Sequence, residues 1–202
     1  MLHQLHMMSV DDPREALLTQ LASSEPSLPE VLSRLAAFHM ASQEQQQPLR
    51  EVTVHADNRF FPHPQDVPAL LLFSLQKLSG FWNRCQSEED DLYVVAFAMY
   101  ALLAIHPFEN ANGRTSLDFV QYLLMKRWEL EKPPLRLERN VHREIASYLA
   151  VLDEPNDGLT PEAFYALRLR LAQRLDQMTL SRLKASKPFQ IVVSFFQKAL
   201  SD

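Results

Sequence analysis

Residues 104–117 combine the residue types that a phosphate-transfer site needs. The segment reads Ala-Ile-His-Pro-Phe-Glu-Asn-Ala-Asn-Gly-Arg-Thr-Ser-Leu. We expect a helix to begin near Gly113, and a helix N-terminus offers unpaired N–H groups and a positive dipole end. Small side chains at Ala111 and Gly113 let a phosphate approach the backbone, and Arg114 adds a positive charge. His106, at the other end of the loop, can remove a proton near neutral pH. The residues alone also allow a plain helix–loop–helix corner with a hydrogen-bonded His106 and a capping Asn112.

The composition predicts that helices position this loop. The chain has 202 residues, of which 47% are hydrophobic and 22% charged, which is ordinary for a globular domain. It has three glycines and long stretches rich in Leu and Ala, which favours helices joined by short connections over a sandwich or barrel. We therefore expect an all-α fold.

Capping residues and first-turn prolines mark the expected helices. They begin at Asp12-Pro13 and at Ser27-Leu28-Pro29, and further helices span 66–82, 87–105, 114–129, 138–152, 160–183 and the stretch from Pro188 to about Leu200. The helix 87–105 is apolar nearly all round, so we expect it to be central. Pro107 ends it, because a proline disfavours helical geometry in the residue before it.

The segment from Glu51 to Phe61 carries the clearest strand signal. Apolar and polar residues alternate through His55, residues 56–59 make a plausible turn, and Phe60-Phe61 follows. A lone hairpin is marginally stable, so we expect it to lie against helices.

Charge and cysteine content exclude several classes of protein. The formal net charge of −5 gives no field that draws the whole chain to nucleic acid or membrane. The run 168–187 is locally basic, which fits a solvated helix face and leaves a partner or nucleic-acid patch open. Cys85 is the only cysteine, so no internal disulfide can form, which fits a reducing compartment. No apolar stretch reaches the ~20 residues of a membrane span, and the N-terminus lacks signal-peptide character. We expect a cytoplasmic protein, with delivery into a host cell as an effector left open.

The segment His106-Pro107-Phe108-Glu109-Asn110-Ala111-Asn112-Gly113-Arg114 resembles the signature loop of the Fic (filamentation induced by cAMP) family, H-P-F-x-[DE]-G-N-G-R-x-x-R. The resemblance extends over roughly 50–175. Upstream, 50–83 is similar to the family's β-hairpin flap and the helix after it, and downstream, 160–164 looks like the start of the closing helix. The family's fold is a compact helical bundle with this flap over the active-site loop. We expect three segments, namely an N-terminal helical extension at 1–48, the Fic core at 49–184 and a C-terminal helix at 185–202.

The resemblance implies a role for each matching position. His106 would be the general base that takes the proton from a target hydroxyl, and Phe108 would be a buried anchor of the loop. Ala111, Asn112 and Gly113 would form the anion hole for the transferring group, and Arg114 would hold nucleotide phosphates. The flap would pin an extended target segment by strand addition, through Val52, Thr53, Val54, His55, Phe60 and Phe61.

The sequence departs from the family pattern at three positions of the loop. Asn110 stands where a carboxylate normally holds Mg²⁺, and its neutral amide oxygen is a weaker ligand; Glu109 is the neighbouring alternative. Ala111 replaces glycine, as in the Doc branch and the phosphocholine-transferring relatives. Gly113 differs from Doc, a kinase with lysine there, which favours nucleotidyl transfer. Leu117 replaces the second arginine, and the inhibitory Ser/Thr-x-x-x-Glu motif that pairs with that arginine is absent from both flanks.

The sequence therefore predicts a protein adenylyltransferase that uses ATP as donor and Mg²⁺ as cofactor. Three alternatives stay open: a degenerate Fic fold that binds a nucleotide or protein, a Doc-like toxin, and a transferase with a phosphocholine-type donor. The expected partners are a target protein bound through the flap and, for a toxin, a separate antitoxin or inhibitor protein. We expect no membrane and no nucleic-acid partner.

Overall fold

The protein is all-α, apart from one short hairpin. Its structure is a computed structural model that describes residues 12–41, 46–56, 59–136, 141–153 and 158–201. The helices are α1 (Pro13–Ser23), α2 (Leu28–His39), α3 (Val67–Trp82), α4 (Glu88–Ile105), α5 (Asn112–Arg127), α6 (Val141–Ala150), α7 (Pro161–Gln177), α8 (Leu180–Ala185) and α9 (Lys187–Ser201), with a 3₁₀ turn η1 (Pro64–Asp66) before α3. Strands β1 (His55–Ala56) and β2 (Arg59–Phe60) pair antiparallel.

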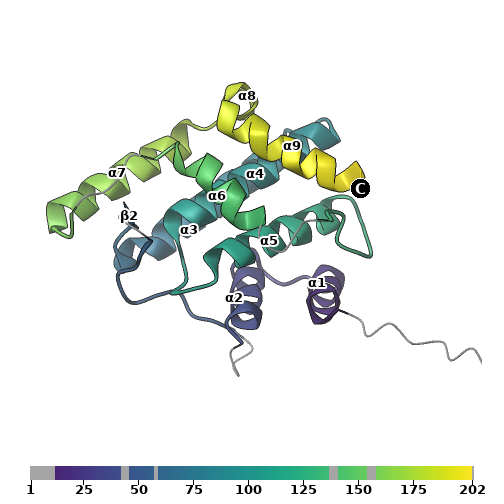
Figure 1. Ribbon diagram of the computed structural model, residues 1–202, viewed down its shortest axis with the longest axis horizontal. Helices are drawn as coiled ribbons and strands as arrows, with labels where there is room; N and C mark the ends of the chain where they lie inside the picture. Colours follow the sequence, from purple (N-terminus) through teal and green to yellow (C-terminus); the bar gives the residue numbers. More distant parts are fainter. Residues whose placement is uncertain (1–11, 42–45, 57–58, 137–140, 154–157, 202) are drawn as a thin grey trace, which may run out of the picture.

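Helix α4 is the centre of the arrangement (Figure 1). Helices α3, α5 and α9 pack directly against it, and α6 lies where α4, α5 and α9 meet. Helices α1 and α2 pack against α5, while α7 contacts α3 and extends outward near the hairpin (Figure 1). Nearly every residue of α4 from Asp90 to Ile105 is buried, which confirms the predicted central helix.

Side-chain caps explain where the helices begin. The Ser87 hydroxyl accepts the N–H of Asp90 at the start of α4, and four acidic residues occupy the positive end of that helix. Asp12 caps α1 and Thr160 caps α7 in the same way, each followed by a first-turn proline. One buried cluster draws on residues from Leu18 in α1 to Ala199 in α9, so the segments 1–48 and 185–202 contribute to the same core as 49–184.

The predicted single helix 160–183 is divided into two helices by a break at residues 178–179. Helix α7 ends at Gln177 because Met178 takes an extended conformation, with φ −65° and ψ 129°. The Thr179 hydroxyl then accepts the N–H of Arg182 and caps a separate helix, α8. Helix α5 begins at Asn112, two residues before the predicted start, and the hairpin strands are shorter than expected. Part of the predicted turn at 56–59 and the predicted helix start at Glu138 lie outside the described residues.

Ion pairs within the fold account for much of the basic run on α7 and α8. Arg168 pairs with Asp66 of η1 at 3.2 Å, and Arg174 pairs with Asp153. Lys184 of α8 pairs with Asp90 of α4. These contacts favour the prediction that the run is a structural helix face. Within the described ranges, no helix combines the length and the apolar character that a membrane crossing requires.

Candidate functional site

His106 lies where α4 ends and the loop begins, in a strained conformation. Its φ of 54° and ψ of 62° belong to the left-handed region, which costs a non-glycine residue about 1 kcal/mol or more. The imidazole stacks on Phe61 of the hairpin, with ring centroids 3.9 Å apart and planes 18° apart. Strain of this kind persists only where the surroundings enforce it, and it clusters at functional sites.

The ring nitrogens of His106 have different surroundings. Nδ1 lies 3.4 Å from the carbonyl oxygen of Leu103, and a carbonyl can only accept, so Nδ1 carries the hydrogen in this long contact. Nε2 then keeps its lone pair and can act as a base. Burial lowers the pKa of His106 to about 4; the Leu103 carbonyl opposes this shift, whereas the charges of Arg50 and Arg59 add to it. The imidazole is therefore neutral at physiological pH.

The loop after His106 is closed by a side-chain clamp. The Oδ1 atom of Asn112 accepts the N–H of Phe108 at 2.9 Å, and its Nδ2 atom donates to the Phe108 carbonyl at 2.8 Å. The Phe108 ring is 1% exposed and lies in the core, as expected for an anchor. His106 is two residues from the clamp and thus at most about 7 Å along the chain from it. The clamp holds both ends of the loop close together.

The N-terminus of α5 offers backbone donors. The structure shows no acceptor among the described residues for the amides of Asn112, Gly113 and Arg114, which are the first three of the helix. Ala111 differs from the sequence prediction, because its amide donates to the Asn110 side chain at 2.6 Å. Ala111 itself lies in the left-handed region, with φ 64°. The candidate anion hole is therefore made by residues 112–114, with the exposed side chain of Arg114 beside it.

The lack of a side chain at Gly113 has a packing reason that the sequence did not suggest. A Cβ atom at this position would lie 2.7 Å from Cδ2 of His142, so something would have to shift. His142 belongs to α6, which packs on α5. The His142 imidazole on α6 thus occupies the space next to Gly113. This contact fixes the first turn of α5 against α6.

The hairpin covers the His106 end of the site. His55 pairs with Phe60 and Ala56 pairs with Arg59, and Val54 accepts the N–H of Phe61 at 3.4 Å. Phe61 is 4% exposed because it lies on His106, whereas Val52, Thr53 and His55 are exposed. The structure therefore brings Phe61 to the site and leaves the remaining predicted flap residues near or at the surface.

Comparison with known proteins decides the family. The model of the Fic/DOC family matches residues 20–124. This chain belongs to the Fic/DOC family. It is 30% identical over 106 residues to the protein adenylyltransferase Fic of Culex quinquefasciatus. That match covers 52% of this chain and 20% of the relative, so the chain corresponds to a minor part of that protein.

The fold of this Fic/DOC chain also matches a solved structure. A Fic domain containing signaling protein from Bacteroides thetaiotaomicron VPI-5482 aligns over 91% of this chain and 69% of its own, with a TM-score of 0.53. The two sequences are 15% identical, so this likeness shows the fold alone. The predicted all-helical Fic fold is confirmed.

The residues of this Fic/DOC loop offer Mg²⁺ one carboxylate, at Glu109, and one neutral amide oxygen, at Asn110. Mg²⁺ in phosphate-transfer sites is usually held by one or two carboxylates together with the substrate phosphates. The oxygen of Asn110 caps the Ala111 amide, and Glu109 is exposed. Among the described residues, no three His, Cys, Asp or Glu side chains are grouped to hold a metal ion. Leu117, which stands at the position of the family's second arginine, is 6% exposed in the core and brings no charge.

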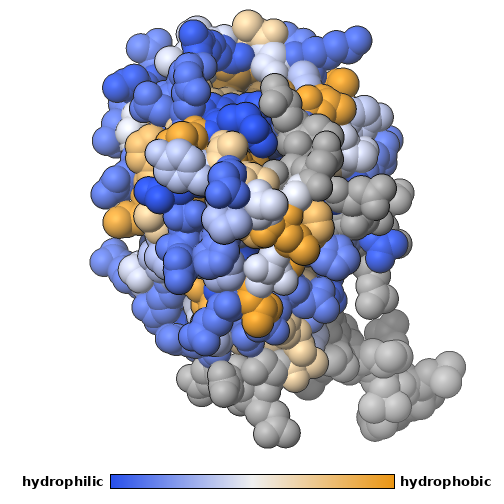
Figure 2. Space-filling model, turned by 90° about the vertical axis from the view of Figure 1, so that its left-hand side faces the viewer, coloured by the Kyte–Doolittle hydropathy of each residue, from blue (hydrophilic) through white to orange (hydrophobic). Residues whose placement is uncertain are grey.

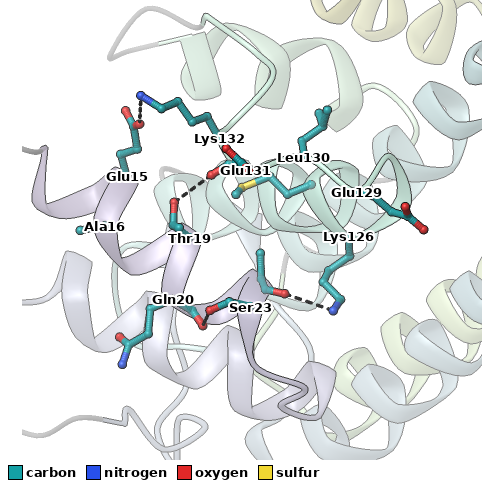
Figure 3. A pocket seen from close by; sticks show the side chains of 12 residues that line it. Glu15, Ala16, Thr19, Gln20, Ser23, Lys126, Glu129, Leu130, Glu131 and Lys132 are labelled. Carbon is teal, nitrogen blue, oxygen red and sulfur yellow. Dashed lines mark hydrogen bonds and ion pairs between the residues drawn. The ribbon is translucent and has the colours of Figure 1, made fainter.

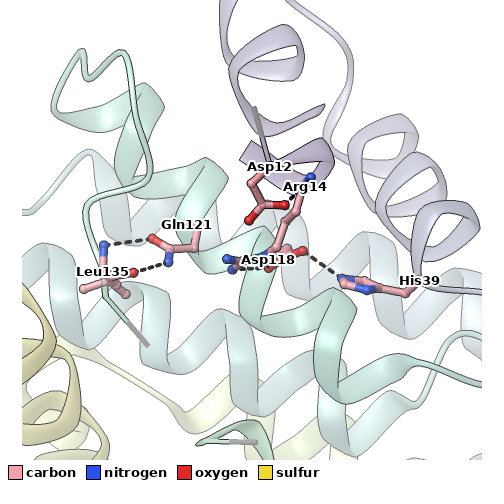
Figure 4. A network of polar contacts seen from close by, with 6 residues as sticks. All are labelled: Asp12, Arg14, His39, Asp118, Gln121 and Leu135. Carbon is pink, nitrogen blue, oxygen red and sulfur yellow. Dashed lines mark hydrogen bonds and ion pairs between the residues drawn. The ribbon is translucent and has the colours of Figure 1, made fainter. Parts of the chain in front are cut away.

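Sequence reasoning missed two buried polar residues that hold the site in place. Arg50, 3% exposed, donates to carbonyl oxygens of the hairpin and of His106. Asp118 of α5, 1% exposed, binds Arg14 of α1 and His39 of α2 (Figure 4). Neither residue lies in the signature loop, and a charged residue in a single sequence carries no mark of burial. Neither residue could therefore be recognised from the sequence as a buried support of the site.

A cavity of about 880 Å³ lies between α1 and the end of α5 (Figure 3). Its wall contains Thr19, which donates to the Glu131 carbonyl, and Lys126, which donates to the Ala22 carbonyl. The cavity adjoins the C-terminal end of α5, whereas the candidate anion hole is at its N-terminus, roughly 20 Å away along the helix. It is not part of the candidate active site.

Proposed function

We propose that this chain transfers AMP from ATP to a serine, threonine or tyrosine hydroxyl of a target protein. The observation that carries the proposal is the loop between α4 and α5. It has a neutral imidazole at one end and, at the other, three helix amides for which the described residues supply no acceptor. A base and an anion hole on one clamped loop are the two groups that such a transfer requires. The name of the Culex relative, protein adenylyltransferase, supports the same activity.

The chemistry would proceed as an in-line displacement at the α-phosphorus of ATP. The target oxygen attacks this phosphorus, Nε2 of His106 takes the hydroxyl proton, and the bond between the α-phosphorus and the bridging oxygen breaks. Pyrophosphate leaves with the electron pair of that bond. The amides of residues 112–114 and the Arg114 guanidinium would stabilise the charge on the transferring phosphate.

The flap would bind the target through its backbone. The described sheet has two strands, so each strand has one edge with no strand partner among the described residues, and strand addition would use such an edge. The face of the molecule at the end of α7 and the hairpin is mostly hydrophilic, and its apolar side chains lie in separate patches (Figure 2). Main-chain pairing at the flap is more consistent with this surface than broad apolar docking.

The contact between Gly113 and His142 favours nucleotidyl transfer over phosphorylation. The Doc kinases to which this sequence is similar have a lysine at this position. A lysine Cβ here would lie 2.7 Å from His142 Cδ2, so the Doc arrangement does not fit unless the His142 side chain or α6 shifts. A kinase-type donor geometry is therefore the less supported alternative.

A binding module without catalysis is the second candidate. Two observations favour it. The Asn110 side chain accepts the Ala111 N–H, and Leu117 is buried. The terminal phosphates of ATP therefore have fewer partners. Such a module would still bind a nucleotide or protein. A toxin restrained by a separate inhibitor protein, an effector, and an enzyme with a phosphocholine-type donor would share the same base and loop.

Radiolabelled ATP distinguishes these functions. The purified chain is incubated with cell lysate, Mg²⁺ and ATP that carries the label in either the α or the γ phosphate. Relative to lysate without the chain, we expect added protein labelling from α-labelled ATP and no added labelling from γ-labelled ATP. Labelling from γ-labelled ATP alone would indicate a kinase, and labelling from neither would contradict the proposal and favour the binding module or another donor.

Two variants serve as controls for this experiment. His106→Ala should abolish the label, because the base is lost. Lys198→Ala, an exposed residue on α9, should leave it unchanged. Labelling that persists in the His106 variant would come from another enzyme in the lysate.

Asn110→Asp is expected to lower the Mg²⁺ concentration that gives half-maximal activity by about tenfold, because a carboxylate supplies the charge that the amide lacks. An aspartate oxygen can still accept the Ala111 amide, so the local backbone should not change. The measurement is the initial rate of transfer against Mg²⁺ concentration. Asn110→Ala, which removes the oxygen, is the control and should not gain Mg²⁺ sensitivity. Equal Mg²⁺ curves for the aspartate variant and wild type would show that position 110 does not face the metal.

A further inference from the structure

Arg50 is a buried arginine that joins the flap to the catalytic loop. Its side chain donates to the carbonyl oxygens of Val52 at 2.9 Å and Pro62 at 2.5 Å, which lie on the two sides of the hairpin. It also donates to the His106 carbonyl at 2.7 Å and, more weakly, to that of Ile105 at 3.5 Å. Its own backbone N–H donates to the Pro107 carbonyl at 3.0 Å.

The charge of Arg50 is compensated by carbonyl dipoles. A buried cation is costly unless it is paired or fully hydrogen-bonded. The carbonyls of Ile105 and His106 are at the C-terminal end of α4, where the helix leaves acceptors unpaired and its dipole is negative. Burial lowers the pKa of Arg50 to about 10, so the side chain stays charged at neutral pH. The planar guanidinium can reach several carbonyls at once, which a lysine ammonium on a flexible stem cannot do in this geometry.

These contacts fix both the backbone and the ring of His106. The Arg50 hydrogen bond holds the His106 carbonyl while that residue has its left-handed conformation. The Pro62 contact holds the chain directly after Phe61, whose ring stacks on the imidazole. A single side chain thus restrains the residue that bears the imidazole and the residue that covers it.

We propose that Arg50 is a positioning residue, which locks the flap onto the carbonyl end of α4 and so orients the His106 imidazole for proton transfer. The proposal rests on the proposed role of His106 as the base. Arg50 and Arg59 are also the charged groups that act on the His106 ring, and both disfavour its protonation. Arg59 is held by Asp153, so its position depends on α7 and the end of α6 as well as on the flap.

The experiment compares wild type with Arg50→Met and Arg50→Lys by NMR. The His106 pKa is measured from the ring proton titration, and the mobility of the flap is measured from amide exchange of residues 54–61. Arg50→Met is expected to raise the His106 pKa toward its ordinary value near 6.5 and to speed flap exchange at least about tenfold. Arg50→Lys keeps the positive charge but loses the planar guanidinium that donates to several carbonyls at once. Flap exchange should therefore speed up, while the His106 pKa should rise less than in Arg50→Met.

Arg127→Met is the matched control, because Arg127 of α5 also binds a buried group, Asp91, away from the flap. It should lower stability and leave both the His106 pKa and the flap exchange unchanged.

In the transfer assay, Arg50→Met should lower kcat about 10–100-fold with a smaller change in KM, since a misplaced base weakens the chemical step.

A folded Arg50→Met protein with the wild-type His106 pKa and wild-type flap exchange would overturn the proposal. Arg50→Lys provides the same test if the methionine variant does not fold. The NMR readouts do not need catalysis, so they decide the role of Arg50 even if wild type transfers no AMP. Absence of transfer would count against the proposed function, and unchanged NMR readouts would count against the positioning role.

Discussion

Replacement of His106 by alanine is expected to lower the rate of AMP transfer by a factor of about 10²–10⁴, the range that a general base contributes. The reason is the geometry at Nε2. Nδ1 faces the Leu103 carbonyl, which leaves Nε2 to take the hydroxyl proton, and alanine supplies no substitute. The measurement is the initial rate of label incorporation from α-labelled ATP. A variant that keeps more than a tenth of the wild-type rate would exclude His106 as the base.

The same variant should change how stability depends on pH. The folded-state pKa of His106 is about 4, below the value near 6.5 expected when unfolded. Between these values the unfolded state binds more protons, so the free energy of unfolding falls as the pH falls. Protonation of His106 should lower the free energy of unfolding of the wild type by about 2 kcal/mol between pH 7 and pH 5. His106→Ala has no imidazole and should not show this decrease.

Urea denaturation of both proteins at pH 7 and pH 5 measures this difference. The other histidines are common to the two proteins, so their effects cancel in the comparison. A parallel decline in both proteins would mean that the imidazole is not held neutral under Phe61. Such a result would question the buried position of the base independently of any activity.

The site can be located from the sequence because its signals are local. His106-Pro107 marks the end of an apolar helix, and Gly113-Arg114 marks the start of the next, so the residue pattern alone delimits the loop between them. Caps and first-turn prolines place most other helices within a few residues, since both act on the neighbouring turn. The buried aromatic anchor Phe108 follows from the resemblance and lies in the core.

The contacts that hold the site could not be predicted, because they join residues far apart in sequence. Arg50 binds His106 across 56 positions, and Asp118 binds His39 across 79. Burial of a charged side chain depends on which elements meet around it, which no local pattern encodes. The capture of the Ala111 amide by Asn110 was missed for another reason. It depends on how the backbone and side chain of Asn110 turn toward the next amide, which the residue pattern does not specify.

Helix α5 has a second buried anchor in Asp118, which fixes α1 and α2 to the helix whose N-terminus forms the candidate anion hole (Figure 4). Its carboxylate accepts from Arg14 at 2.5 and 2.6 Å and lies 2.7 Å from Nε2 of His39. Burial alone would raise the pKa of Asp118, but hydrogen bonds from His39 and Arg14 and the Arg14 charge outweigh it, so the pKa is lowered. The group is therefore a carboxylate at neutral pH.

Asp118→Ala is expected to reduce the free energy of unfolding by about 3 kcal/mol, because it leaves two partly buried partners, Arg14 and His39, without their acceptor. The value falls at the low end of the range for broken buried pairs, since the Arg14 side chain is 32% exposed and can be rehydrated. Urea denaturation measures the loss, and amide exchange in α1 should accelerate most, because Arg14 then no longer ties that helix to α5.

The matched control is Asp176→Ala, whose side chain is 75% exposed and pairs with Lys77 at 3.9 Å. That change should cost less than about 1 kcal/mol, as surface pairs do. Similar losses for the two variants would mean that Asp118 contributes no more than a surface charge, and that α1 is held to α5 by its apolar residues Leu18 and Leu21 alone.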